Sequence, residues 1–181
     1  MRRAVVQALI LTMSAVVSPL VANAGGPLEL RAYLAGQPIA LDAVARYHCH
    51  DREYPVIDCF ATEQERDQDA GLTPRAVAVA AASDSPLFGA TDLASAVFYV
   101  TFYEHSNFAG ASYATSQEIA HLGLIGWNDA ISSFKSLNGQ RPKWWQDIDF
   151  ANFSWQWPAS YWVSYVGDGA NDRFSSVKNV P

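Results

Sequence analysis

Short stretches of alternating apolar and polar residues dominate the C-terminal half of the chain, a pattern typical of β-strands. Residues 97–105 (VFYVTFYEH) form an apolar and aromatic run, SNFAG supplies a turn, and ASYAT alternates again, which predicts a hairpin. Further short runs separated by Gly, Asn, Asp and Ser continue to residue 181. The pattern predicts a mainly β sandwich or Greek-key arrangement over residues 97–181.

The preceding part of the chain has a weaker pattern. Residues 47–60 read as two short strands, and Thr62 followed by Glu65 predicts a capping-box start for a short acidic helix. Residues 73–96 are rich in Ala, with Pro and Gly, and we interpret them as a connector. Within it, periodicity does not decide between strand and helical turn for residues 76–82.

The first 24 residues have the form of a cleaved secretory signal: a basic start, an apolar run and a small-x-small ending at Ala22 to Ala24. The alternative is an N-terminal membrane anchor, but the apolar run is shorter than the roughly 20 residues that a spanning helix needs. We therefore expect a secreted, soluble mature protein with no membrane span and an N-terminal region over residues 25–72.

Two cysteines, Cys49 and Cys59, are present in the whole chain. An even count in an exported protein favours a disulfide, which would pin the two predicted strands together. Because His48 and His50 flank Cys49, a metal site is conceivable, but this spacing matches no usual zinc motif. The sequence thus predicts a small disulfide-pinned region ahead of the β domain.

Composition narrows the choice of partners. The net charge of −6 and the isoelectric point near 5.0 argue against nucleic acid, which needs a basic surface to replace phosphate counterions. Only 17% of residues are charged while 13% are aromatic. This balance suits a compact, aromatic-rich β protein.

One sequence stretch occurs twice. Residues 127–135 (WNDAISSFK) return at 170–178 as ANDRFSSVK, 43 residues later. A second correspondence places Ser106 to Phe108 (SNF) opposite Ala151 to Phe153 (ANF). We interpret the C-terminal domain as two units, about 97–138 and 139–181.

These residues resemble the βγ-crystallin family. FYEHSNFAGASY is similar to the opening hairpin of its Greek key, and NDAISS and NDRFSS match its calcium-binding signature at every specified position. The resemblance implies a βγ-crystallin-like double Greek-key sandwich. In our alignment of the two units, Trp155 stands where the first unit has Gly110, and Ile148 answers Tyr103, so the second hairpin is expected to depart from the pattern.

The chemistry of the repeated residues agrees with calcium binding, because Ca²⁺ takes oxygen ligands from carboxylates, amides, carbonyls and water. The signatures supply six oxygen-bearing side chains: Asn128, Asp129, Ser132, Asn171, Asp172 and Ser175. The family pattern implies that Ser132, Ser175, Asp129 and Asp172 are side-chain ligands. It also implies that main-chain carbonyls near Glu104, Ala130 and Arg173 assist. With about one formal negative charge at each site, we expect a Kd on the order of 10⁻⁵ to 10⁻³ M.

Other interpretations remain open at this stage. A single Asn-Asp-x-x-Ser-Ser is usually only a turn. We find no catalytic motif and expect no enzyme activity. A secreted peptidase inhibitor or antimicrobial toxin-like module, presenting Tyr54 and Pro55 on the disulfide-pinned loop, is the main alternative. A module that binds cell-wall polysaccharide through tryptophans is the weaker one. We expect most tryptophans in the core, with Trp144 or Trp145 the likeliest exposed ring.

Overall fold

The computed structural model describes residues 29–72, 98–137 and 139–180. The predicted signal (1–24) and the predicted connector (73–96) lie outside the described residues. No helix within the described ranges is long and apolar enough to cross a membrane.

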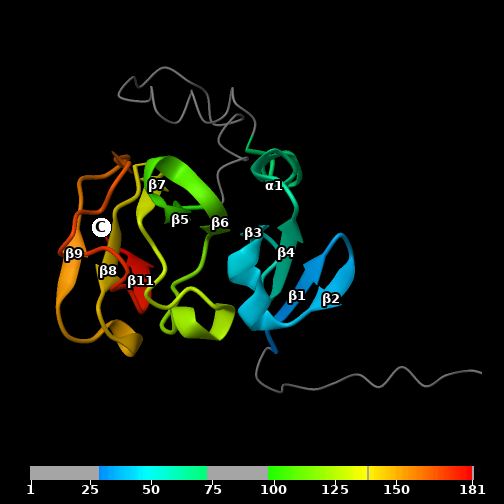
Figure 1. Cartoon of the computed structure of the whole chain (residues 1–181), viewed down its shortest axis with the longest axis horizontal. Helices are drawn as coiled ribbons and strands as arrows, with labels where there is room; N and C mark the ends of the chain where they lie inside the picture. The colour runs from blue at the N-terminus through cyan, green and yellow to red at the C-terminus, as the bar shows by residue number, and fades with distance from the viewer. Residues whose placement is uncertain (1–28, 73–97, 138, 181) are drawn as a thin grey trace, which may run out of the picture.

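The described residues form two β-sheets, so the prediction of a mainly β protein is confirmed (Figure 1). The larger sheet has the strand order β10-β7-β5-β6-β3-β4-β1-β2, and the smaller has the order β11-β8-β9. The strands of the N-terminal region are β1 (Arg31–Leu34), β2 (Gln37–Ile39), β3 (His48–His50) and β4 (Val56–Phe60). Those of the C-terminal half are β5 (Val100–His105), β6 (Ala109–Thr115), β7 (Ser133–Ser136), β8 (Pro142–Trp145), β9 (Ser154–Gln156), β10 (Trp162–Val163) and β11 (Ser176–Asn179).

The two units of the C-terminal half are interlocked, because each contributes a segment that pairs with the sheet of the other. β5 pairs with β6 and β7, while β8 pairs with β9 and β11, so each unit supplies three strands of its own sheet. In addition, β10 of the second unit pairs with β7 of the first, while Ile119 of the first unit makes one isolated bridge to Val177 in β11. The predicted hairpin over 97–115 is present as β5 and β6.

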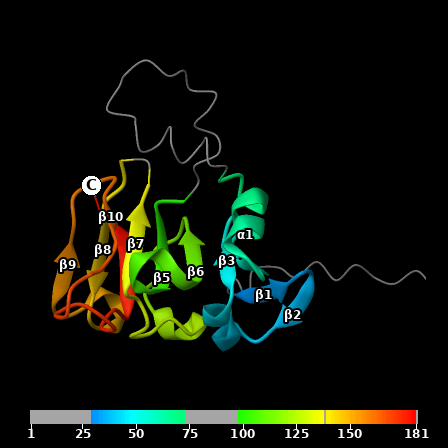
Figure 2. The same ribbon diagram turned by 45° about the horizontal axis from the view of Figure 1, so that its top comes forward.

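The N-terminal region continues the larger sheet. β3 pairs in parallel with β6, with Cys49 opposite Tyr113, so the edge of the first Greek key is extended by four strands (Figure 2). Cys49 and Cys59 face each other on β3 and β4 and form the predicted disulfide. Helix α1 (Glu63–Asp69) begins with the predicted capping box between Thr62 and Glu65. The C-terminal half also contains the short 3₁₀ turns η3 (Ser106–Phe108), η4 (Leu122–Ile125) and η5 (Ile148–Phe150).

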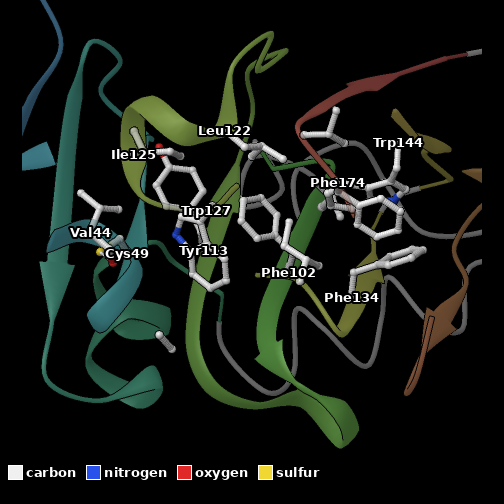
Figure 3. Close-up of a cluster of buried hydrophobic side chains, with 14 of the residues drawn as sticks. Val44, Cys49, Phe102, Tyr113, Leu122, Ile125, Trp127, Phe134, Trp144 and Phe174 are labelled. Carbon is white, nitrogen blue, oxygen red and sulfur yellow. Dashed lines mark hydrogen bonds between the residues drawn. The ribbon is translucent and has the colours of Figure 1, made fainter. Parts of the chain in front are cut away.

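Aromatic side chains fill the core between the sheets (Figure 3). Phe102 from β5 meets Trp144 from β8 edge to face, with ring centroids 5.6 Å apart, and Trp144 stacks on Phe174 at 4.9 Å. Trp127 contacts the other side of this cluster, 4.9 Å from Phe102. Such rings bury a large apolar area, which is the main source of stability in a small β domain.

The expectation of an exposed ring at Trp144 or Trp145 is wrong, because their relative exposures are 0% and 7%. Both lie on β8, the central strand of the smaller sheet, where adjacent residues point to opposite faces. Trp144 points into the core, and Phe150, Lys143 and Lys178 cover Trp145. The exposed tryptophan is instead Trp162, at 43%, on the edge strand β10.

Candidate functional site

The two Asn-Asp signatures fold into loops of the same local shape. Asp129 and Asp172 both adopt left-handed backbone conformations, with φ of 54° and 53°. In each loop the preceding Asn donates its side-chain amide to the Asp carboxylate, at 2.6 Å for Asn128 and 2.7 Å for Asn171. Asn and Asp tolerate this conformation better than most residues. The residue choice therefore sets the loop geometry as well as the chemistry.

The two loops are joined to one another by reciprocal main-chain hydrogen bonds. Asp129 N donates to Phe174 O at 3.1 Å, and Asp172 N donates to Ile131 O at 3.4 Å. The pairing brings each signature Asp next to the strand-entry residues of the other loop. The loops, far apart in sequence, therefore form a single structural unit.

The carboxylates of the paired loops repel each other. The pKa of Asp129 is raised, first by burial and then by the negative charges of Asp172 and Asp147, while the Asn128 amide opposes the rise. A cation between the loops would relieve this repulsion, because opposite charge favours the ionised carboxylate. The electrostatics of the unit favour a positively charged ligand.

Ser132 and Ser175 are fixed at the start of the strands that leave the loops. Ser132 N donates to Tyr103 O at 3.1 Å, and Ser175 N donates to Trp145 O at 2.9 Å, which ties each loop to its own hairpin. Both residues are buried, and their hydroxyls make no hydrogen bond within the described ranges. A hydroxyl without a protein partner has a free oxygen to offer to a ligand.

The adjacent serines have a different task. Ser133 Oγ donates to His105 O at 2.5 Å and accepts from Phe108 N at 3.1 Å. Ser176 Oγ donates to Asp147 O at 2.7 Å and accepts from Phe150 N at 3.1 Å. These bonds close each hairpin onto its Greek key, which is a structural role.

The main-chain carbonyls named from the sequence are those of Ala130, Arg173 and Glu104. The carbonyls of Ala130 and Arg173 accept no main-chain hydrogen bond among the described residues. Glu104 lies at the register shift between Tyr103 and His105, where a bulge leaves one residue unpaired. The side chain of Arg173 is exposed, so its charge does not fill the loop.

The structure corrects the alignment of the two hairpins. Turn η3 (Ser106–Phe108) corresponds to η5 (Ile148–Phe150), and not to Ala151 to Phe153, because Phe108 and Phe150 make the same bonds to Ser133 and Ser176. Trp145, and not Ile148, is therefore the residue of the second unit that is structurally equivalent to Tyr103. Both rings meet the turn aromatic edge to face, at 5.6 Å and 5.4 Å.

The corrected alignment also removes the expected irregularity at Trp155. Gly110, with φ of 78°, is answered by Asn152, with φ of 63°, so the second hairpin keeps the left-handed residue that the turn requires. Glu104 is answered by Gln146, a position that sequence reasoning missed. The signal that could have found it is the Trp145-to-Phe150 spacing, which equals that from Tyr103 to Phe108.

The zinc interpretation of residues 48–50 loses its thiolate, because Cys49 is bonded to Cys59. No group of three or more His, Cys, Asp or Glu side chains in the described part of the chain is placed to hold a metal ion. The paired loops form no such group, because most of their oxygen atoms belong to Ser, Asn and the main chain.

The chain is similar to solved βγ-crystallin domains. A double mutant of such a domain from Clostridium beijerinckii is 32% identical, with a TM-score of 0.40, over 44% of this chain and 93% of that one. A βγ-crystallin from an archaeon is 25% identical, with a TM-score of 0.40, over 45% and 95%. A domain from Flavobacterium johnsoniae is 24% identical, with a TM-score of 0.41, over 45% and 93%. No family model and no curated protein matches the chain.

Proposed function

Because this chain belongs to the βγ-crystallin family, we propose that it is a secreted, non-catalytic calcium-binding protein in which Ca²⁺ stabilises the fold. The observation that carries the proposal is the joined pair of loops. In one unit it combines two serine hydroxyls and two carbonyls that have no hydrogen-bond partner among the described residues with two mutually repelling carboxylates. Oxygen-only donors of this kind suit a hard cation such as Ca²⁺.

Two ions are proposed, each shared between the loops. The first site combines the Ser132 hydroxyl with the carbonyls of Ala130 and Glu104 and the carboxylate of Asp172. The second site combines the Ser175 hydroxyl with the carbonyls of Arg173 and Gln146 and the carboxylate of Asp129. Asn128 and Asn171 shape the loops through their bonds to the Asp carboxylates.

The expected effect of Ca²⁺ is on stability. A ligand that binds only the folded state stabilises it by about 2.7 kcal/mol at a concentration one hundred times its Kd. At millimolar Ca²⁺ this applies to a site with a Kd of about 10⁻⁵ M, the tight end of the expected range. The melting temperature should therefore rise with Ca²⁺ concentration.

Calorimetric titration of the chelator-treated mature protein tests the proposal. The wild type should release heat in a two-site isotherm, and Ser132→Ala and Ser175→Ala should each remove one site. Ser164→Ala is the matched control, since Ser164 is exposed and its hydroxyl makes no hydrogen bond among the described residues. Absence of both heat and a rise in melting temperature at millimolar Ca²⁺ would show the proposal to be wrong.

Secretion is tested separately. Mass spectrometry of the protein released by a secreting host should find a chain beginning at Gly25, the residue after the small-x-small ending. Retention of residues 1–24 in a membrane fraction would instead support the anchor.

The inhibitor alternative gains no support from the structure. Residues 51–56 fold into two tight turns, closed by Tyr54 N to Asp51 O at 3.1 Å and Val56 N to Glu53 O at 3.0 Å. A substrate-like inhibitor needs an extended segment whose main chain is free to pair with the peptidase. The polysaccharide alternative was based on the tryptophan cluster of residues 144–162; Trp144 and Trp145 are buried, and Trp162 is the exposed ring of that cluster.

A further inference from the structure

Helix α1 of the N-terminal region packs beside β3 and β4, on the side of β6 away from the smaller sheet, and its side chains reach β5 and β6 (Figures 1 and 2). Arg66 is buried there, and its Nη1 donates to Ser112 Oγ on β6 at 2.8 Å. Its Nη2 pairs with Glu63 and Asp67. The similar βγ-crystallin domains are covered almost completely by less than half of this chain.

Glu63 is the residue of α1 that reaches β5. Its Oε1 accepts from Tyr103 OH at 2.6 Å and from Arg66 at 3.1 Å, and Lys135 Nζ lies 3.9 Å away. Lys135 also lies over the Tyr103 ring, 4.9 Å from its centroid. Tyr103 is 1% exposed, and its hydroxyl donates to this carboxylate beside the Arg66 guanidinium, which also interacts with it.

Tyr103 connects this contact to the first calcium site. Its main-chain oxygen accepts from Ser132 N, and the next residue is Glu104, whose carbonyl is assigned to the same site. The side chain that Glu63 holds and the main chain that positions two ligands therefore belong to one residue. Movement of Tyr103 along β5 would shift both ligands together.

The second unit has no equivalent arrangement. Trp145 replaces Tyr103 and is flanked by Lys143 and Lys178, with no hydroxyl to donate. In the described part of the chain neither lysine forms an ion pair. The N-terminal region is therefore connected to the loop of the first unit through Tyr103, with no equivalent contact to Trp145 of the second unit among the described residues.

We propose that α1 positions the first calcium site, with Glu63 acting through Tyr103, so that docking of the N-terminal region sets the affinity of one site and leaves the other unchanged. This inference rests on the proposed function. Glu63 and Tyr103 are positioning residues and do not touch the ion.

The affinity test isolates one site at a time. In a Ser175→Ala background, Tyr103→Phe should weaken Ca²⁺ binding about fivefold, the lower end of typical coupling between sites. In a Ser132→Ala background the same change should leave the Kd unaltered. Glu63→Ala should weaken binding by the same factor, and the double variant should weaken it no further. Glu63→Gln should keep part of the wild-type affinity, because the amide oxygen still accepts the hydrogen bond from Tyr103. Glu53→Gln, exposed and in the same region, is the charge control.

Hydrogen exchange in the Ca²⁺-free protein separates this inference from the proposed function. Tyr103→Phe should speed exchange of the Ser132 amide, which is bonded to Tyr103 O, and not of the Ser175 amide. Equal acceleration at both amides, or none at Ser132, overturns the coupling whether or not the protein binds Ca²⁺. If Tyr103→Phe speeds exchange at Ser132 alone but the wild type binds no Ca²⁺, the coupling between Glu63, Tyr103 and the loop is supported and the proposed function is overturned.

Discussion

Asp51 is the buried carboxylate that joins the N-terminal region to the first Greek key, and its substitution should change how stability depends on pH. It is 1% exposed and accepts hydrogen bonds from Thr115 Oγ1, from Tyr113 OH at 3.4 Å and from Ser116 N at 2.9 Å. Burial raises its pKa from the ordinary 3.8 to about 6, and the hydrogen bonds oppose part of that rise. Asp51→Asn replaces the group with a neutral one of the same size.

The magnitude follows from the linkage between proton binding and folding. A pKa of about 6 in the folded state against 3.8 in the unfolded state is equivalent to about 3 kcal/mol of unfolding free energy. Because the folded pKa is the higher one, this stability is fully present below about pH 3.8 and is lost as the pH rises through about 6. The wild type should lose about 3 kcal/mol relative to Asp51→Asn between pH 3.5 and pH 7.5.

Urea unfolding in the presence of a chelator, followed by tryptophan fluorescence from pH 3.5 to 7.5, measures this difference. A change of about 3 kcal/mol moves the midpoint by at least about 1 M, given m-values of about 1–3 kcal/mol/M. Other carboxylates cancel in the comparison, and exposed Asp42→Asn serves as the control for losing one charge. A difference between wild type and Asp51→Asn that stays constant over this range refutes the reasoning.

Three further outcomes concern the core and its links. Trp144→Ala should cost about 4 kcal/mol of unfolding free energy in urea titration, because the ring is fully buried against Phe174; a cost near 1 kcal/mol would contradict the packing. Ser133→Ala should cost about 2 kcal/mol, measured by thermal unfolding, since it leaves Phe108 N and the carbonyl of His105 without their partner. Reduction of the disulfide between Cys49 and Cys59 should lower the unfolding free energy by about 2.5 kcal/mol on the chain-entropy model, for a separation of 10 residues. An unchanged urea midpoint would count against this prediction.

Local features of the chain were predictable because they depend on neighbouring residues. The capping box at Thr62, the disulfide to Cys59 and the hairpin of β5 and β6 all follow from short-range patterns, and each is present. The resemblance to βγ-crystallins was also recognisable, since two stretches with the same Asn-Asp-x-x-Ser-Ser pattern, 43 residues apart, are rare by chance. Assignment of calcium to these signatures stays a prediction.

Pairings between distant segments were not predictable in the same way. The parallel pairing of β3 with β6 has no local signature, because it depends on which sheet edge is open after the Greek key has formed. The burial of Trp145 depends likewise on lysines from two different strands, β8 and β11. Sequence reasoning expected one exposed ring at Trp144 or Trp145, while the sheet places one on each face and covers both.

The error in aligning the two hairpins has a specific physical cause. Asn-Phe occurs at residues 107–108 and again at 152–153, but identical letters do not mark identical turns. The turn requires two successive left-handed residues and an aromatic that contacts the strand, and Asp149 with Phe150 meets both conditions. Asp replaces Asn there because both side chains tolerate that conformation. The conformational requirement, and not the residue name, is what the two units share, and it gives Gln146 the place of Glu104 beside the second Asn-Asp loop.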